Sequence, residues 1–159
     1  MNIADVQGEQ HEQHTLELYE QGSRKVYTVD REIPFPEGKL IVSLTDTKGI
    51  ITQTNRAFVE MSGYERDELI GQAHSILRHP EMPAVAFKGL WDDVDAGKKW
   101  HGYVKNLRKD GAYYWVYATV VANVRNGNVV GYTSVRRKPS RTKIEECIKL
   151  YKELKDGEA

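Results

Sequence analysis

Apolar and polar residues first fall into a clear pattern at residues 40–44, where the apolar side chains of an extended segment share one face and predict a strand. The Asp-Thr-Lys-Gly sequence at residues 46–49 is typical of a tight turn, and the β-branched residues 50–54 predict a returning strand. The two segments therefore predict a β-hairpin. Residues 1–28 are polar and rich in Gln, Glu and His, and we expect a flexible arm or a short helix there.

The pattern changes to helical spacing after this hairpin. Asn55 is placed to cap a short helix that Gly63 ends, and a second helical turn is expected at residues 65–69. Irregular sequence follows, and a longer helix is expected from about Pro83 to Gly97. Its apolar side chains recur at helical spacing and predict one stripe that faces a core: Phe87, Leu90, Trp91 and Val94.

Three further segments are rich in β-branched and aromatic residues, and they predict strands at residues 100–108, 113–124 and 129–137. The short connections between them carry Asp-Gly and Asn-Gly, which are typical of hairpins. Two strands, several short helices and three strands together predict an α+β fold. Its centre is a five-stranded antiparallel sheet with helices on one face.

A last helix is expected after Pro139, with Ser140 as its N-cap. Its apolar side chains form a stripe that requires a partner: Ile144, Cys147, Ile148, Tyr151 and Leu154. We divide the chain into a polar N-terminal arm or cap (1–32), a core domain (33–138) and a C-terminal amphipathic linker helix (139–159). The arm and the helix also offer surfaces for a homodimer.

Length and composition narrow the class of protein. A chain of 159 residues, 40% of them hydrophobic, suits a single globular domain. Lys and Arg together number 23, as do Asp and Glu, so net charge favours neither nucleic acid nor an anionic membrane as a partner. No apolar run approaches the roughly 20 residues of a membrane helix, and we expect neither a membrane span nor a secretory signal. The single cysteine, Cys147, fits a cytoplasmic protein.

Several contiguous motifs resemble those of the PAS domain family. The general resemblance rests on TDTKGII (45–51), NRAF (55–58) and SGYERDELIG (62–71). Four further segments are similar to the FAD-binding PAS domains of bacterial aerotaxis receptors: RHPEMP (78–83), AFKGLW (86–91), WHGYVKN (100–106) and RKDGAYYWV (108–116). The resemblance spans about residues 33–138. It implies a PAS fold, a noncovalently bound FAD that reports redox state, and attachment to a chemoreceptor signalling module.

A flavin ring requires a flat apolar slot, hydrogen-bond partners at its polar edge, and a cation for the phosphates. Arg78 and His79 match the flavin-contacting motif of the family, and an arginine can hold phosphate or ring oxygens through two N–H groups. Asn106 lies within a strand, where an amide is unfavourable unless it has a partner. A surface ion pair for Arg78 and a backbone-satisfying bulge for Asn106 are the alternative interpretations.

Aromatic residues and one further amide complete the candidate set. Trp91 can stack on the ring or serve as an ordinary core residue, and Trp100 can form a wall of the slot or cover the sheet edge. Asn55 has a competing role as a helix N-cap. The predicted FAD-binding residues are therefore Arg78, His79, Trp91, Asn106, Trp100, Asn55 and Phe87, with no catalytic and no metal-binding residue.

Other chemistry has less support in the sequence. His74 and His101 raise the alternative of haem ligation, although neither lies on an inward helical stripe. His11 and His14 lack the neighbouring ligands of a metal site. Cys147 lies on the exit helix, outside the sensor core, which excludes the cysteine photochemistry of light-sensing flavin domains.

We predict a redox or oxygen sensor of the aerotaxis type rather than an enzyme. In this hypothesis, Asn106 re-forms its hydrogen bonds when FAD is reduced, because an amide can exchange donor for acceptor, and the exit helix changes its pose. One alternative is a cofactor-free PAS module that serves dimerisation or partner binding. Another is a flavin reductase, but the sequence shows no second substrate site.

Overall fold

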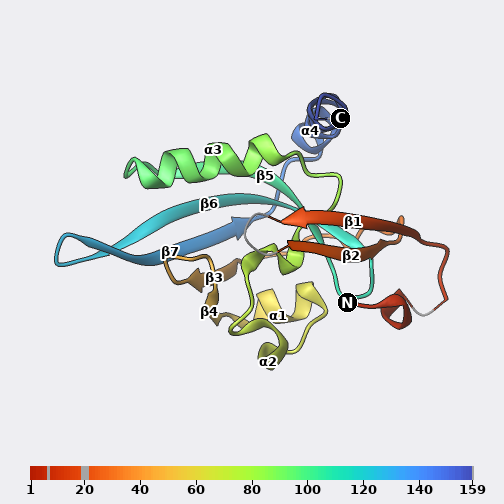
Figure 1. The fold of residues 1–159 in the computed structure, drawn as a ribbon, viewed down its shortest axis with the longest axis horizontal. Coiled ribbons are helices and arrows are strands. Elements are labelled where there is room, and N and C mark those ends of the chain that lie inside the picture. The colour runs from red at the N-terminus through yellow and green to blue at the C-terminus, as the bar shows by residue number, and fades with distance from the viewer. Residues whose placement is uncertain (7, 19–21, 159) are drawn as a thin grey trace.

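A five-stranded antiparallel sheet forms the centre of the molecule, and its strands follow the order β4-β3-β7-β6-β5 (Figure 1). The computed structural model describes residues 1–6, 8–18 and 22–158. The strands are β3 (Ile41–Thr45), β4 (Ile51–Thr54), β5 (Trp100–Leu107), β6 (Tyr113–Arg125) and β7 (Asn128–Arg137). The sheet predicted from the alternating pattern and the hairpin turns is confirmed.

Helices between β4 and β5 cover one face of this sheet, which we call the inner face. They are α1 (Arg56–Ser62), α2 (Arg66–Leu69), the 3-10 helix η2 (His74–Leu77) and α3 (Ala84–Asp95). The predicted caps of α1 are confirmed, since the Asn55 side chain accepts a hydrogen bond from the Phe58 N–H and Gly63 adopts the left-handed conformation. Phe58 packs with Tyr114, Val116 and Ala118 of β6 in the main apolar core, which fixes the helical layer against the inner face.

The N-terminal region forms a β-hairpin, so the expected flexible arm or short helix is wrong. After the 3-10 helix η1 (Ile3–Val6), strand β1 (Glu12–Leu18) pairs antiparallel with β2 (Gly22–Thr28). Only Leu16 and Val26 are buried in these strands, and they pack on Leu107 of β5. With one buried apolar residue in each strand, the alternating pattern is too short to predict a strand. Residues 19–21 lie outside the described chain.

Backbone pairing joins this hairpin to the sheet. The Val29 N–H donates to the Gly111 carbonyl at 2.8 Å, and Ile33 N–H donates to the Tyr113 carbonyl at 2.8 Å. Gly111 has a φ of 86°, and a Cβ built on it would lie 2.8 Å from a Val6 methyl. A glycine is therefore required where the N-terminal segment crosses the β5–β6 turn.

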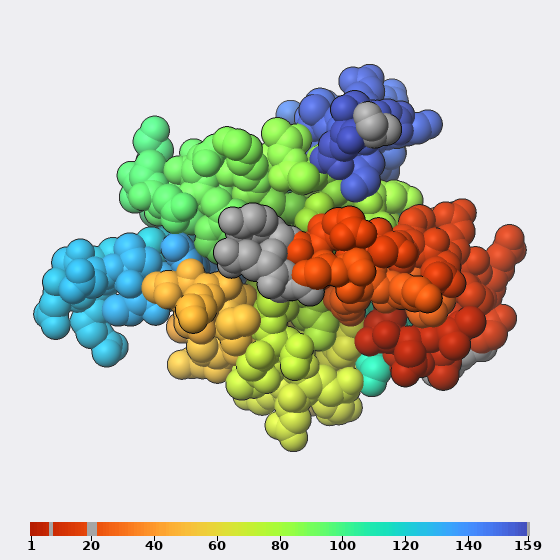
Figure 2. All heavy atoms as spheres, viewed as in Figure 1, coloured from red at the N-terminus to blue at the C-terminus, as the bar shows by residue number. Residues whose placement is uncertain are grey.

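The last helix, α4 (Arg141–Asp156), packs on the opposite, outer face of the sheet. Its predicted N-cap is confirmed, since the Ser140 side chain accepts from the Lys143 N–H. The Tyr151 hydroxyl donates to the Tyr103 carbonyl at 2.7 Å, and the Tyr151 ring stacks on Trp115. In Figure 2, α4 (dark blue) lies at one side of the body and the β6–β7 hairpin (light blue) projects at the other.

Candidate functional site

Polar side chains are buried along the inner face, where a sheet packed against helices is ordinarily apolar. Ser43, Asn106 and Arg136 are each at most 4% exposed. The strand register places them on one face with Tyr114 and Thr54, because Asn106 pairs with Tyr114, Arg136 with Ala118, and Ser43 with Thr54. The Asn106–Tyr114 pair and the Arg136–Ala118 pair are four residues apart along β6, so this polar set spans roughly 14 Å of the face.

Arg136 is the most unusual member of the set. Its Nη2 donates to Ser43 Oγ at 3.0 Å and to His74 Nε2 at 2.6 Å, and its guanidinium carbon lies 5.1 Å from the centre of the Phe58 ring. No carboxylate within the described chain forms an ion pair with it. Burial lowers the pKa of Arg136 to about 10, so the guanidinium remains a cation at neutral pH.

His74 is neutral in this arrangement. Because an arginine can only donate, the His74 Nε2 atom must accept, and the proton of the ring is on Nδ1. Burial of the ring, together with the nearby Arg136 charge, lowers the pKa of His74 from 6.5 to about 3. Ser43 Oγ also lies 3.3 Å from the same nitrogen. His74 thus fixes the position of the arginine without neutralising its charge.

Unsatisfied hydrogen-bonding atoms gather around this face. Within the described residues, five buried side-chain atoms make no hydrogen bond of good geometry, although the Asn106 side chain lies beside the Tyr114 hydroxyl: Thr54 Oγ1, Arg78 Nε, Asn106 Nδ2, Tyr114 OH and Arg136 Nη1. Native proteins pair nearly all such atoms, with protein groups or with ligands and water. Four of the five are on the inner face, and the fifth belongs to the residue that forms a β-bridge with Asn106. These atoms comprise N–H donors and hydroxyl groups, so they can hydrogen-bond to the acceptor atoms of a polar ligand.

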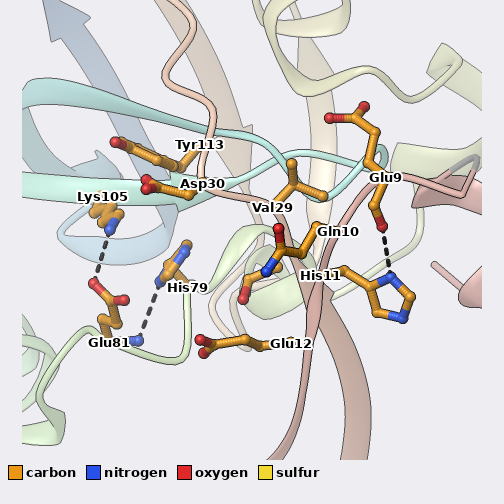
Figure 3. Close-up of a pocket in the computed structure, with 11 residues that line it drawn as sticks. Glu9, Gln10, His11, Glu12, Val29, Asp30, His79, Glu81, Lys105 and Tyr113 are labelled. Carbon is orange, nitrogen blue, oxygen red and sulfur yellow. Dashed lines mark hydrogen bonds and ion pairs between the residues drawn. The ribbon is translucent and has the colours of Figure 1, made fainter.

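The structure separates the predicted Arg78 and His79 pair. Arg78 lies over the Phe87 ring of α3 at 4.9 Å, and burial lowers its pKa. His79 instead lines a cleft of about 780 Å³ with Lys105, Tyr113 and residues of the N-terminal segment (Figure 3). There its Nδ1 accepts from the Glu81 N–H at 3.1 Å. Arg78, Phe87 and Asn106 are brought together, whereas His79 faces a different space.

Asn55, Trp91 and Trp100, three further predicted residues, have structural contacts. Asn55 Oδ1 accepts from the N–H groups of Val42 and Phe58, and its Nδ2 donates to the Leu40 carbonyl, so its amide is occupied. Trp91 is 41% exposed and meets Tyr132 edge to face. The expected orientation of Trp91 toward the core is wrong, because the α3 stripe is buried only at Val94.

Trp100 packs against the main apolar core and against a second apolar cluster formed by Val94, Val120 and Tyr132. It also covers Gly102, where a Cβ would lie 2.3 Å from the indole ring. This contact agrees with the interpretation of Trp100 as a residue that covers the edge strand. The glycine is required because the indole occupies the space of any larger side chain.

The haem alternative loses its geometric basis. His74 Nε2 is engaged by Arg136, and His101 stacks on Tyr117 of the outer face. In the described part of the chain, no group of three or more His, Cys, Asp or Glu residues is placed to hold a metal ion. Cys147 is half-buried on α4.

Sequence reasoning missed Arg136, Tyr114, Ser43 and Thr54. The available signal was strand alternation: Arg136 lies on the same side of β7 as Tyr132, which packs against α3. A charged residue at a strand end is common on a surface, so only the pairing of β7 with β3 and β6 revealed that this position is covered.

Residues 51–136 match the protein family described as the PAS fold. The chain belongs to the PAS family. This PAS domain is 40% identical to the aerotaxis receptor of Escherichia coli (strain K12) over 131 residues, which cover 82% of this chain and 26% of the receptor. It is 29% identical over 80 residues to the nitrogen fixation regulatory protein of Klebsiella pneumoniae, covering 50% of this chain and 16% of that protein. The PAS domain thus spans about a quarter or less of the length of these relatives.

Solved structures share the fold. The light-state structure of the Aureochrome1 light-oxygen-voltage (LOV) domain matches with a TM-score of 0.62 and 24% identity, over 69% of this chain and 88% of that one. A structure reported as "Flavin Analogue Sheds Light on Light-Oxygen-Voltage Domain Mechanism" matches with a TM-score of 0.63 and 24% identity, over 70% and 85%. This PAS domain is thus related in sequence to the aerotaxis receptor and shares its fold with the LOV structures. None of the helices described here has the length and apolar character needed to span a membrane.

Proposed function

We propose that this PAS domain senses redox state or oxygen through a noncovalently bound FAD held at the inner face. The observation that carries the proposal is the set of unpaired buried atoms on Thr54, Arg78, Asn106, Tyr114 and Arg136. The relationship to the aerotaxis receptor supports a flavin over other flat ligands. When bound, the flavin supplies reversible electron transfer, which the chain's own side chains cannot.

Each residue of the inner face has a separate task. Asn106 and Tyr114 provide hydrogen bonds for the polar edge of the ring, and Phe87 with the core residues provides the apolar wall. Arg78 lies at the α3 side, where a cation suits the phosphates. His79, Trp91, Trp100 and Asn55 remain in the predicted set, but their contacts favour supporting roles.

The sheet offers a direct path for the signal. Strand β5 carries Asn106 on the inner face and Tyr103 on the outer face, three residues away. The Tyr103 carbonyl accepts from Tyr151 of α4 at 2.7 Å, and the Tyr103 hydroxyl accepts from the Ser140 N–H at 3.3 Å. A rotation of the Asn106 amide that shifts β5 therefore acts on both the start and the middle of α4. The result is a population shift of the exit helix.

The proposal also includes the partners of the domain. α4 exposes Ile148, Leu150 and Leu154, which suit a homodimer or a following signalling module in a longer cytoplasmic chemoreceptor. A cofactor-free interaction module is the second candidate, and the same exposed apolar residues favour it.

An absorption spectrum of the purified protein separates these candidates. The FAD proposal predicts bands at ~370 and ~450 nm that bleach reversibly with dithionite, and FAD released on denaturation. A colourless protein that does not bind added FAD would favour the interaction module. Asn106→Ala tests the switch: if this variant binds FAD and keeps the wild-type redox-dependent change of α4, Asn106 is not the switch residue.

A further inference from the structure

Arg136 is a buried cation without a counter-charge in the described chain. It is 3% exposed, its Nη2 is held by Ser43 and neutral His74, and its Nη1 has no partner. A single buried charge is costly, and proteins normally pair it with an opposite charge. The two neutral acceptors fix the direction of the guanidinium and leave its positive charge available to a ligand on the inner face.

The surroundings explain why this charge acts at long range. Phe58 and the main apolar core lie beside the guanidinium, and Arg136 lies close enough to Tyr114 for each group to affect the pKa of the other. In a medium of low dielectric constant, a fixed charge interacts far more strongly with a new opposite charge than it does in water. Negative charge that forms anywhere on the inner face is therefore stabilised by Arg136.

We propose that the Arg136 guanidinium, oriented by Ser43 and His74, stabilises the negative charge that reduction places on the bound flavin and so raises its affinity for electrons. This inference rests on the proposed function of FAD binding. In the relevant step, an external reductant such as dithionite delivers two electrons and one proton to the neutral ring system, which gains one negative charge. Arg136 neither accepts nor donates an electron or a proton, and its role is electrostatic.

The experiment compares Arg136→Gln, Arg136→Lys and a matched control, Arg137→Gln. Arg137 is the next residue of β7, exposed on the other face. Each FAD-bound protein is equilibrated anaerobically with a reference dye of known potential, and the ratio of reduced to oxidised cofactor is measured. Arg136→Gln is expected to lower this ratio at least tenfold at a given potential, about 30 mV for two electrons. Arg136→Lys retains the charge and is expected to stay within threefold of wild type, as is Arg137→Gln.

The possible contrary results distinguish failure of FAD binding from failure of the proposed role of Arg136. If wild-type protein binds no FAD, the proposed function fails and this inference fails with it. If wild type binds FAD but the ratio in Arg136→Gln is unchanged, or Arg136→Lys behaves like Arg136→Gln, only the role of the charge is refuted. If Arg136→Gln binds oxidised FAD more than tenfold more weakly, Arg136 serves binding of the oxidised cofactor, and the proposal is again wrong.

The cofactor-free protein gives an independent readout. An uncompensated charge in the core destabilises the fold, so Arg136→Gln without FAD is expected to unfold at the same temperature as wild type or higher. A clear fall of the unfolding temperature in the cofactor-free variant would show that Arg136 is a structural residue of the core.

Discussion

Replacement of Asn106 by leucine should stabilise the cofactor-free protein and weaken FAD binding. Asn106 is 4% exposed and its Nδ2 has no partner, which costs about 1–3 kcal/mol in a folded protein. Leucine has the same branched skeleton of four heavy atoms and no polar group, so much of that cost is removed. We expect a gain of about 1 kcal/mol, which raises the unfolding temperature by about 3 °C in a chain of this size. The lost hydrogen bond to the ring should weaken FAD binding by about 5- to 150-fold.

Asn123→Leu is the matched control. This asparagine is on the outer face of the same sheet, and its Oδ1 accepts from Thr133 Oγ1 at 2.8 Å. Its replacement should lower stability by about 1 kcal/mol, because a satisfied hydrogen bond is lost, and should leave FAD affinity unchanged. Thermal unfolding of the cofactor-free proteins and fluorescence titration with FAD measure both quantities. If Asn106→Leu destabilises the cofactor-free protein and binds FAD as wild type does, its unpaired amide is not a ligand contact.

Three further perturbations test the supporting structure. Gly111→Ala should detach the N-terminal hairpin and speed tryptic cleavage there, because a φ of 86° and the contact with Val29 cost about 1–2 kcal/mol for any larger residue; unchanged cleavage would contradict the docking. Tyr151→Phe should lose about 1 kcal/mol and increase hydrogen exchange in α4, since its bond to Tyr103 is removed; equal exchange would refute that anchor. The lowered pKa of His74, about 3 in the fold against 6.5, predicts stability that is complete above pH 6.5 and falls with decreasing pH toward about 3, by up to about 1.4 kcal/mol per pH unit. Urea unfolding of His74→Gln should show a weaker pH dependence, and an identical one would contradict the assignment.

The sheet and its helices were predictable because their signals are local. Asn55 and Gly63 mark the two ends of α1, and the Gly-containing turns separate β5, β6 and β7. The N-terminal hairpin was not predictable, because its stability depends on contacts with Leu107 and the Gly111 turn, which are distant in the sequence. A local sequence pattern thus predicts a helix or strand only where that helix or strand contains several buried apolar residues.

The candidate site divides in the same way. Asn106 could be predicted, since an amide inside a strand is unfavourable without a partner. Arg136 could not, because its burial follows from the order of the strands, with β7 between β3 and β6. Arg78 and His79 were expected to act together from their adjacency, but neighbouring residues in an extended segment point in different directions, and only Arg78 joins Asn106.

Hydrogen exchange of the FAD-bound protein, measured anaerobically before and after reduction, tests the account most directly. The account predicts bleaching of the flavin together with altered exchange in β5 and in α4, residues 100–107 and 141–156. The distant β6–β7 turn at residues 125–128 should exchange equally in both states. Full reduction of the flavin without any change in β5 or α4 would contradict the claim that this domain transmits the redox state of its cofactor.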